Sequence, residues 1–203
     1  MTLAHKIEQI IKDQDIKLLI FDCDGTLMET LHLHYQAWNE SFLKLGYNFI
    51  PEDEFIAQYA GISGNEMVVS VINKQGYNID STPILANKKK IFLEKYISQV
   101  RPIEKTLNIA QKYHSNLEMV VASGGSKDTV MKMLVLNDVL KLFSQVITKE
   151  DVKLGKPDPE IFLKAAKSQN IPPKNCLVLE DHFAGFDAAV NAGMHYIDIN
   201  NYI

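Results

Sequence analysis

The sequence lacks several features that would place it in a special class of protein. It has only two cysteines in 203 residues, Cys23 and Cys176, so we expect free buried thiols rather than a disulfide framework. No apolar run approaches the ~18 residues of a membrane-spanning helix, and the N-terminal segment has no signal-peptide core. A net charge of −4 gives no basic surface for nucleic acid. These absences predict a cytoplasmic protein that binds neither membrane nor nucleic acid, with a monomer as the default.

What the sequence does contain is an alternation of strand-like and helix-like segments. The sequence has five short apolar runs, and segments with helical periodicity lie between the last four of them. Examples are Lys127–Leu136 after Ser126 and Glu160–Ser168 after Pro159. This alternation predicts a Rossmann-like α/β core, an open parallel sheet with helices on both faces. Five short apolar runs are the expected strands: Leu18–Phe21, Met119–Ala122, Gln145–Ile147, Leu177–Leu179 and Tyr196–Ile199.

The stretch between the first and second expected strands does not follow this alternation. Its apolar residues recur at helical spacing, and glycines and prolines interrupt them at intervals. We therefore expect an all-helical domain at 30–99, inserted after the first strand. Residues 1–29 and 100–203 would then form the catalytic core.

Polar residues follow four of the expected strands. Asp22 and Asp24 follow the first, Ser123 and Gly124 the second, and Glu180 with Asp181 the fourth. Lys156 lies in the loop after the third. The carboxyl ends of parallel strands meet at one edge of a sheet, so these side chains are expected to share one crevice.

Each residue type in this group suits the transfer of a phosphoryl group. A carboxylate such as Asp22 is ionised at neutral pH and can attack phosphorus directly. Magnesium prefers hard oxygen ligands, which Asp22 and Asp181 offer, and Lys156 can neutralise both nucleophile and phosphate. Ser123 and the glycine amides after it can donate hydrogen bonds to phosphate oxygens. Gly25 permits a sharp turn that can bring Asp24 beside the leaving group, where crowding would raise its pKa.

At these residues the chain resembles the haloacid dehalogenase superfamily, in the subgroup of sugar-phosphate phosphatases and β-phosphoglucomutases. The resemblance is carried by four motifs that occur in order over nearly the whole chain, and their joint occurrence is far more specific than any one of them. The four motifs are Phe21-Asp22-Cys23-Asp24-Gly25-Thr26-Leu27, Val121-Ala122-Ser123-Gly124, Gly155-Lys156-Pro157-Asp158-Pro159 and Leu179-Glu180-Asp181 followed by Gly185.

The resemblance implies a role for each residue. Asp22 would be the nucleophile and Asp24 the general acid and base, with Mg²⁺ held by Asp22, by the backbone carbonyl of Asp24, by Asp181 and by Glu180. For Glu180, metal contact and support of the neighbouring ligands stay equally open. The helical insert corresponds to the family's cap, in which His34 and Lys88 would face the substrate. Lys89 is the alternative to Lys88.

Two positions depart from the family's pattern. His182-Phe183-Ala184 follows the acidic pair where a serine and a small residue are usual, which leaves the metal ligands intact. Gly64 stands where β-phosphoglucomutases carry an arginine for a second phosphate. The loss of that arginine favours a phosphatase over a mutase.

The predicted function is Mg²⁺-dependent hydrolysis of a small phosphate monoester, a sugar phosphate, as in fructose-1-phosphatases. The alternative is a β-phosphoglucomutase-type isomerase. A phospho-accepting signalling domain also places an aspartate, an acidic pair, a hydroxyl and a lysine at strand ends. Such domains are much shorter, place the acidic pair before the acceptor and have no helical insert, so this third hypothesis is remote.

Overall fold

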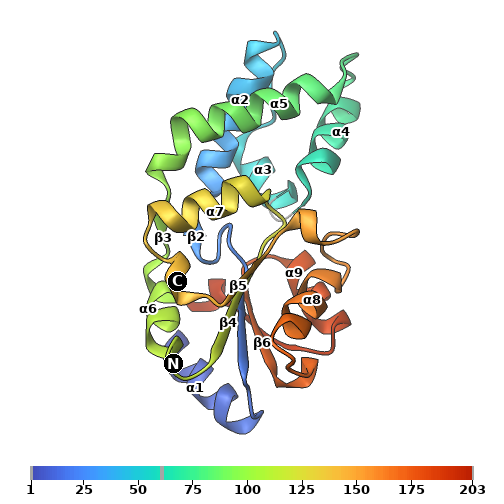
Figure 1. Ribbon diagram of the computed structural model, residues 1–203. Coiled ribbons are helices and arrows are strands. Elements are labelled where there is room, and N and C mark those ends of the chain that lie inside the picture. Colours follow the sequence, from blue (N-terminus) through green and yellow to red (C-terminus); the bar gives the residue numbers. More distant parts are fainter. Residues whose placement is uncertain (1, 60–61, 203) are drawn as a thin grey trace. The chain divides into compact units, whose positions relative to one another are not determined.

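The computed structural model describes residues 2–59 and 62–202, and the chain divides into two compact units. We call Met1–Glu29 with Arg101–Ile203 the core unit, and Thr30–Val100 the helical unit. In Figure 1 the colours follow the sequence, so each unit can be found from its residue numbers. Within the described ranges, no helix is both long enough and apolar enough to cross a bilayer.

The core unit is built around a parallel sheet with the strand order β5-β4-β1-β6-β7. Each predicted strand is present, and the boundaries differ by one residue at some ends. The strands are β1 (Leu18–Phe21), β4 (Glu118–Ala122), β5 (Gln145–Ile147), β6 (Cys176–Glu180) and β7 (His195–Asp198). The central strand β1 is paired with β4 on one side and β6 on the other, and the predicted α/β fold is confirmed.

The helices of the core unit cover both faces of this sheet (Figure 1). The chain moves outward from β1 through β4 to β5, then returns to β6 and β7. Right-handed crossovers in these two directions put the connecting helices on opposite faces. The helices are α1 (Leu3–Asp13), α6 (Glu104–Tyr113), α7 (Lys127–Leu136), α8 (Glu160–Ser168) and α9 (Phe183–Asn191), with short helices η3 (Leu140–Leu142), η4 (Lys149–Asp151), η5 (Pro173–Asn175) and η6 (Ile199–Tyr202).

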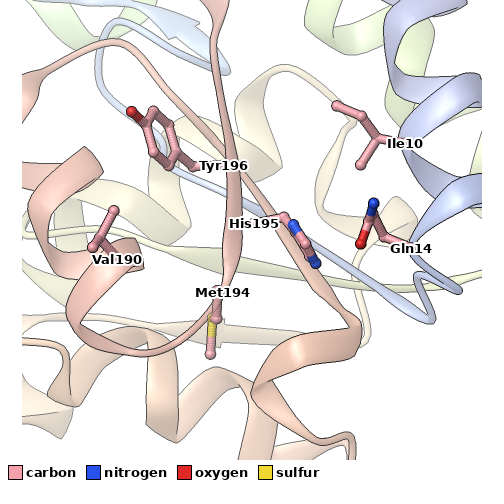
Figure 2. Close-up of a pocket in the computed structure, with 6 residues that line it drawn as sticks. All are labelled: Ile10, Gln14, Val190, Met194, His195 and Tyr196. Atoms are coloured by element: carbon pink, nitrogen blue, oxygen red, sulfur yellow. The ribbon is translucent and has the colours of Figure 1, made fainter.

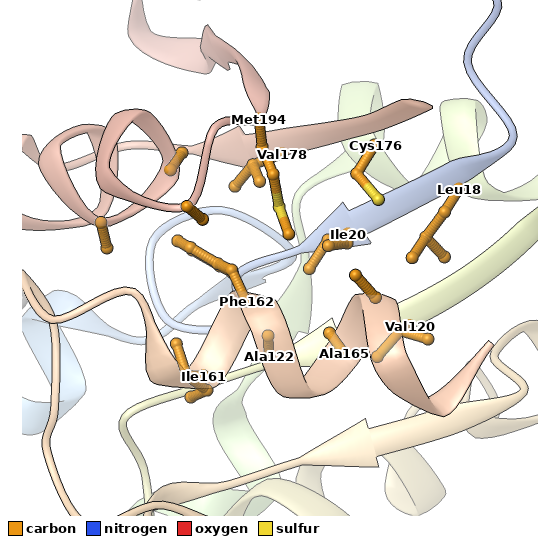
Figure 3. Close-up of a cluster of buried hydrophobic side chains, with 14 of the residues drawn as sticks. Leu18, Ile20, Val120, Ala122, Ile161, Phe162, Ala165, Cys176, Val178 and Met194 are labelled. Atoms are coloured by element: carbon orange, nitrogen blue, oxygen red, sulfur yellow. The ribbon is translucent and has the colours of Figure 1, made fainter. Parts of the chain in front are cut away.

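The strand alternation decides which side chains meet these helices. Leu18 and Ile20 of β1 are fully buried and share one cluster with residues of α8 and α9 (Figure 3). Leu19 and Phe21 are also fully buried and point to the opposite face, because successive side chains alternate across a strand. A strand that is buried on both faces reads as a continuous apolar run, which is why β1 was predicted from its composition alone.

The helical unit contains no strand within its described residues, as predicted. Its apolar cluster includes Trp38, Phe42 and Phe55, all buried. These aromatic side chains are therefore core of the unit, as their helical spacing indicates. Its elements are α2 (Leu31–Lys44), α3 (Glu52–Tyr59), α4 (Gly64–Gln75), α5 (Ser81–Ile91), the π-helical turn η1 (Phe92–Tyr96) and η2 (Ile97–Gln99).

Two features of the core unit were not predicted. A two-stranded antiparallel pair, β2 (Met28–Glu29) with β3 (Arg101–Pro102), joins the two segments of the core unit that flank the insert in the sequence. Ser126 stands at the N-cap position of α7 but does not cap it, since its hydroxyl lies 2.9 Å from that of Thr129. The two cysteines are free and buried, as expected.

Ile161 and Leu163 provide a test of this packing. Ile161 is 1% exposed in the cluster against β1, whereas Leu163 on the same helix is 39% exposed. We expect Ile161→Ala to lower the free energy of unfolding by about 2–5 kcal/mol, because it removes buried methyl groups and leaves a cavity. Leu163→Ala should cost less than about 1 kcal/mol. Urea unfolding followed by circular dichroism measures both, and equal losses would contradict the assigned packing.

Candidate active site

The strand order brings the predicted residues to one edge of the core sheet. Asp22 follows β1 directly, and its backbone N–H donates to the carbonyl of Leu179 in β6 at 3.0 Å. Glu180 is the last residue of β6, and Ser123 follows β4. Since β1 lies between β4 and β6, the three strand ends are neighbours.

Lys156 is the cation of this site. Its Nζ donates to Asp22 Oδ1 at 2.5 Å and to Glu180 Oε2 at 2.8 Å. The three side chains expose 7%, 9% and 3% of their area, so both ion pairs are shielded from water. Burial alone would lower the pKa of Lys156, but the charges of Asp22 and Glu180 raise it above the ordinary lysine value. Lys156 is therefore a permanent positive charge beside Asp22.

One lysine does not balance the acidic groups around it. Burial raises the pKa of Asp22 to about 7, and burial with the charge of Asp22 raises that of Glu180 to about 7. The pKa of Asp181 is also raised to about 7, by burial and by the charge of Glu180. Carboxylate oxygens of these three residues lie within 4.8 Å of one another. Three converging hard oxygen donors with excess negative charge fit a divalent cation, so the cluster could hold a metal ion.

The loop after β1 shapes the position of Asp181. Thr26 Oγ1 donates to Asp181 Oδ1 at 2.9 Å, and Thr26 is fully buried. Gly25 has φ +85°, and a Cβ at this position would lie 2.3 Å from Asp181 Oδ2. Glycine is required here both for the left-handed backbone and for the approach of the carboxylate.

Ser123 is 1% exposed and links the loop after β4 to Asp24. Its hydroxyl lies 3.4 Å from Asp24 Oδ2, and it accepts the backbone N–H of Gly125 at 3.0 Å. Asp24 is half-buried, and its carboxylate is not one of the three that cluster. The assignment of its backbone carbonyl as a metal ligand stays a prediction.

The start of α7 is partly satisfied by the protein itself. The backbone N–H of Lys127 donates to Glu150 Oε2 at 3.0 Å. The carboxylate of Glu150 thus accepts the hydrogen bond of the first amide of this helix, a position at which an anion is favoured. Gly124 is exposed beside Ser123, and its role in phosphate binding stays a prediction.

The helical unit carries the two other predicted substrate residues, and they contact each other. Lys88 Nζ lies 3.0 Å from His34 Nδ1. An ammonium can only donate, so Nδ1 accepts and the neutral imidazole carries its proton on Nε2. Lys88 Nζ also lies 4.9 Å from the Trp38 ring and 5.1 Å from the Phe92 ring, while His34 stacks on Phe92 at 4.2 Å. Lys88 is the lysine in contact with His34 in this hydrogen bond, and Lys89 is exposed. Which of the two lysines meets the substrate stays a prediction.

Some residues that shape the site were not identified from the sequence. Thr26 belongs to the first motif, but the sequence assigns it no role of its own. No motif in the sequence indicates a role for Thr106. This residue is fully buried, and its hydroxyl donates to the carbonyl of Thr26 at 2.7 Å. Gly185 was noted only as part of the fourth motif. A Cβ at Gly185 would lie 2.1 Å from Glu180 Cδ, so its lack of a side chain makes room for Glu180.

His182, which follows the acidic pair, caps helix α9. It stands at the N-cap position of α9, and its Nδ1 lies 3.4 Å from the backbone N–H of Ala184. Burial lowers the pKa of His182, and the charge of Lys156 lowers it further. Its ring contacts that of Phe183, with centroids 4.0 Å apart.

A hollow of the core unit lies away from the carboxylates (Figure 2). This groove of about 320 Å³ is formed by α1, by the end of α9 and by the beginning of β7. The beginnings of parallel strands are at the opposite edge of the sheet from their ends, so it is not part of the candidate active site. Its lining residues are Ile10, Gln14, Val190, Met194, His195 and Tyr196.

Comparisons with known proteins identify the family of the chain. Residues 19–199 match the family model of haloacid dehalogenase-like hydrolases, and the chain belongs to this family. The fructose-1-phosphate phosphatase YqaB of Escherichia coli is 27% identical over 89% of this chain and 95% of its own length. The β-phosphoglucomutase of Bacillus subtilis is 27% identical over 91% of this chain and 83% of its own. The predicted enzyme class, a hydrolase of phosphoric monoesters, is confirmed.

Solved structures show the same fold. CbbY from Rhodobacter sphaeroides, crystallised with phosphate, superposes with a TM-score of 0.80 at 24% identity, covering 90% of this chain and 85% of that one. A hydrolase from Pseudomonas syringae gives a TM-score of 0.76 at 26% identity, covering 90% and 84%. The five-stranded parallel sheet with a helical insert after its first strand is therefore common to this chain and its relatives.

Gly185 tests whether the space beside Glu180 matters for activity. Gly185→Ala should push the Glu180 side chain aside and release one of the two contacts of Lys156. Since a displacement of about 1 Å in a catalytic group can cost 10²-fold, we expect a loss of kcat/KM of that order. Gly155→Ala is the matched control, because nothing lies within 4 Å of a Cβ added there. Assays on phosphate esters compare the two, and a fully active Gly185→Ala variant would refute the constraint.

The raised pKa values predict how stability depends on pH when no metal is bound. A carboxyl group with a folded pKa near 7 and an unfolded pKa near 4 stabilises the protein below about pH 4. That contribution is lost as the pH rises through about 7. In EDTA the free energy of unfolding should therefore fall between about pH 5 and about pH 8, and Mg²⁺ should reverse the fall.

Asp181→Asn provides the control for this experiment. The amide cannot ionise, so the variant should lose less stability than the wild type over the same pH range in EDTA. It should also gain less from Mg²⁺, since one charged ligand is missing. Urea unfolding at both pH values, with and without the metal, measures all four conditions. A variant that follows the wild type throughout would show that Asp181 is not part of a charged cation site.

Proposed function

We propose that the protein hydrolyses a small phosphate monoester, a sugar phosphate, with Mg²⁺ and through an aspartyl-phosphate intermediate on Asp22. The observation that carries this proposal is the pairing of Asp22 with the buried ammonium of Lys156 inside a cluster of carboxylates. A lone buried aspartate would repel a phosphate. A lysine in contact with it lowers that repulsion and holds the nucleophile in one orientation.

The reaction follows from the assigned roles. An oxygen of Asp22 attacks the phosphorus, and the bond from phosphorus to the ester oxygen breaks. The departing oxygen takes a proton from Asp24, and the phosphoryl group is left on Asp22. Asp24 then takes a proton from a water molecule, which attacks the phosphorus and releases inorganic phosphate. Asp22 and Asp24 thereby return to their starting protonation states.

The other residues of the core unit bind the transferred group. Ser123 is buried beside Asp24 and would donate its hydroxyl to a phosphate oxygen, with the Gly124 amide as a second donor. Lys156 would offset the negative charge of the phosphate as well as that of Asp22. Ser123 exchanges its present weak contact with Asp24, at 3.4 Å, for this stronger charge-assisted bond.

Mg²⁺ would be held by the carboxylates of Asp22 and Asp181 and by the backbone carbonyl of Asp24. When bound, it supplies positive charge that draws the phosphate toward the acidic cluster and stabilises the transition state. Oε2 of Glu180 accepts a hydrogen bond from Lys156, and Oε1 of Glu180 lies 3.3 Å from the backbone nitrogen of Asp181. Both oxygens thus have partners, which favours support of its neighbours over direct metal contact.

We further propose that the helical unit, residues 30–99, is the cap domain and selects the substrate. Lys88 offers a cation and His34 an Nε2–H donor, and both groups suit the hydroxyl and phosphate oxygens of a sugar phosphate. Their contacts with Phe92 and Trp38 hold them in place. The fructose-1-phosphate phosphatase of Escherichia coli supports a sugar phosphate as the substrate.

The surroundings of Gly64 favour hydrolysis over the mutase alternative. A Cβ at this position would lie 3.1 Å from the Trp38 ring, and Trp38 is 5% exposed. A side chain at Gly64 would therefore press against the ring of a buried tryptophan. Gly64 itself offers no donor for a second phosphate.

Phosphate release from a panel of esters with Mg²⁺ tests the proposal. We expect turnover of hexose or ketose monophosphates, and Asp22→Asn should reduce it on the order of 10⁴-fold or more, because an amide is not a nucleophile. Excess EDTA should silence the wild type. Full activity of a folded Asp22→Asn protein, or activity that survives thorough chelation, would refute the mechanism.

Measuring both free phosphate and glucose 6-phosphate separates the phosphatase from the mutase hypothesis. With β-glucose 1-phosphate and a trace of the 1,6-bisphosphate, free phosphate should be the main product. Faster accumulation of glucose 6-phosphate would make the protein a mutase. Release of phosphate only from other classes of ester would change the substrate and leave the chemistry of Asp22 in place.

A further inference from the structure

The peptide of Asp181 has a hydrogen-bond partner that the mechanism above does not use. Asn200 Nδ2 donates to the backbone carbonyl of Asp181, with 2.6 Å between nitrogen and oxygen. Asn200 lies in η6, which follows the last strand of the sheet. Both residues belong to the core unit.

The strand register explains why these two residues meet. In the parallel pair of β6 and β7, Glu180 is opposite Asp198. The chain after Glu180 turns into α9, and the chain after Asp198 turns into η6. Asp181 is therefore the first residue beyond the ladder on one strand, and the η6 turn lies next to it on the other.

The turn that carries Asn200 is itself held from several sides. Asp198 accepts the backbone N–H of Asn200 at 2.9 Å and the side-chain amide of Asn201 at 3.1 Å. Lys105 Nζ donates to the carbonyl of Ile199 at 3.2 Å. Asn200 is exposed, but these bonds restrict the backbone from which its amide reaches Asp181.

The carbonyl bond completes the restraint of Asp181. Thr26 holds its Oδ1, Gly25 packs against its Oδ2, and its backbone N–H lies 3.3 Å from Glu180 Oε1. The carbonyl is the remaining polar group of the residue, and Asn200 binds it. Since neighbouring carboxylates repel Asp181, its orientation depends on such restraints.

We propose that Asn200 is a positioning residue for Asp181, which keeps the Asp181 carboxylate directed at the divalent cation. This inference rests on the proposed function, because it assigns Mg²⁺ to the carboxylate cluster. Groups that orient a metal ligand commonly affect metal affinity by tenfold or more. A single exposed amide acting through the peptide should contribute at the lower end of that range.

The test is the binding of Mg²⁺ to the whole protein without substrate, measured by isothermal titration calorimetry. We expect Asn200→Ala to raise the Mg²⁺ dissociation constant about threefold to tenfold, which is what one hydrogen bond supplies. The Mg²⁺ concentration for half-maximal activity should rise by the same factor. The KM for the phosphate ester at saturating Mg²⁺ should stay within about twofold of the wild type.

Asn201→Ala is the matched control. It removes one hydrogen bond from the same turn, to Asp198, and leaves the bond to Asp181 intact. We expect its Mg²⁺ dissociation constant to equal that of the wild type, and both variants to unfold at similar urea concentrations. Wild-type Mg²⁺ affinity in Asn200→Ala, or an equal loss in Asn201→Ala, would overturn the inference alone. A wild-type protein that binds no Mg²⁺ would overturn the proposed function together with it.

Discussion

The structure of the site depends on one buried ammonium among several carboxylates. Lys156 contacts Asp22 and Glu180, and Asp181 completes the acidic cluster. The strand order makes this arrangement possible, because β1 lies between β4 and β6 and the ends of three strands meet. The charges remain unbalanced, and burial raises the pKa of all three acidic groups. Buried carboxylates with this little compensating charge are costly in stability, and a divalent cation bound to the cluster would offset that cost.

The residues around the cluster serve to direct the carboxylates rather than to react. Gly25 and Gly185 leave space for the carboxyl groups of Asp181 and Glu180, and a Cβ at either position would overlap them. Thr26 binds Asp181, and Thr106 in turn binds the carbonyl of Thr26. Two segments of the core unit, the loop after β1 and helix α6, therefore restrain the Asp181 carboxylate, the second one through Thr26. Such convergence restricts the cluster to a single geometry in spite of its internal repulsion, which is the preorganisation that electrostatic catalysis requires.

The sequence was sufficient for the parts of the fold that depend on local pattern. The central strands β1, β4 and β6 read as apolar runs because both of their faces are buried, and site residues stand at their carboxyl ends. The edge strands β5 and β7 are shorter apolar runs that are partly exposed. The pair β2–β3 has two residues per strand, too few to show any alternation. Ser126 stands directly before α7, but its hydroxyl lies close to that of Thr129 and does not cap the helix. Asn200 could not be recognised, because its contact with Asp181 requires the register of β6 and β7.

In the function proposed above, the choice between hydrolysis and phosphate migration depends on side chains of the helical unit rather than on the nucleophile. Arginine binds a phosphate through two parallel donors, whereas a lysine is a compact point charge. Gly64 offers no such donors, and a Cβ there would lie 3.1 Å from the Trp38 ring. Lys88 of the same unit contacts His34. Such a pair can recognise one anionic or hydroxyl group but cannot hold a second phosphate in a fixed, bidentate geometry. A bisphosphate would then gain little over a monophosphate, and water rather than the sugar would receive the phosphoryl group from Asp22.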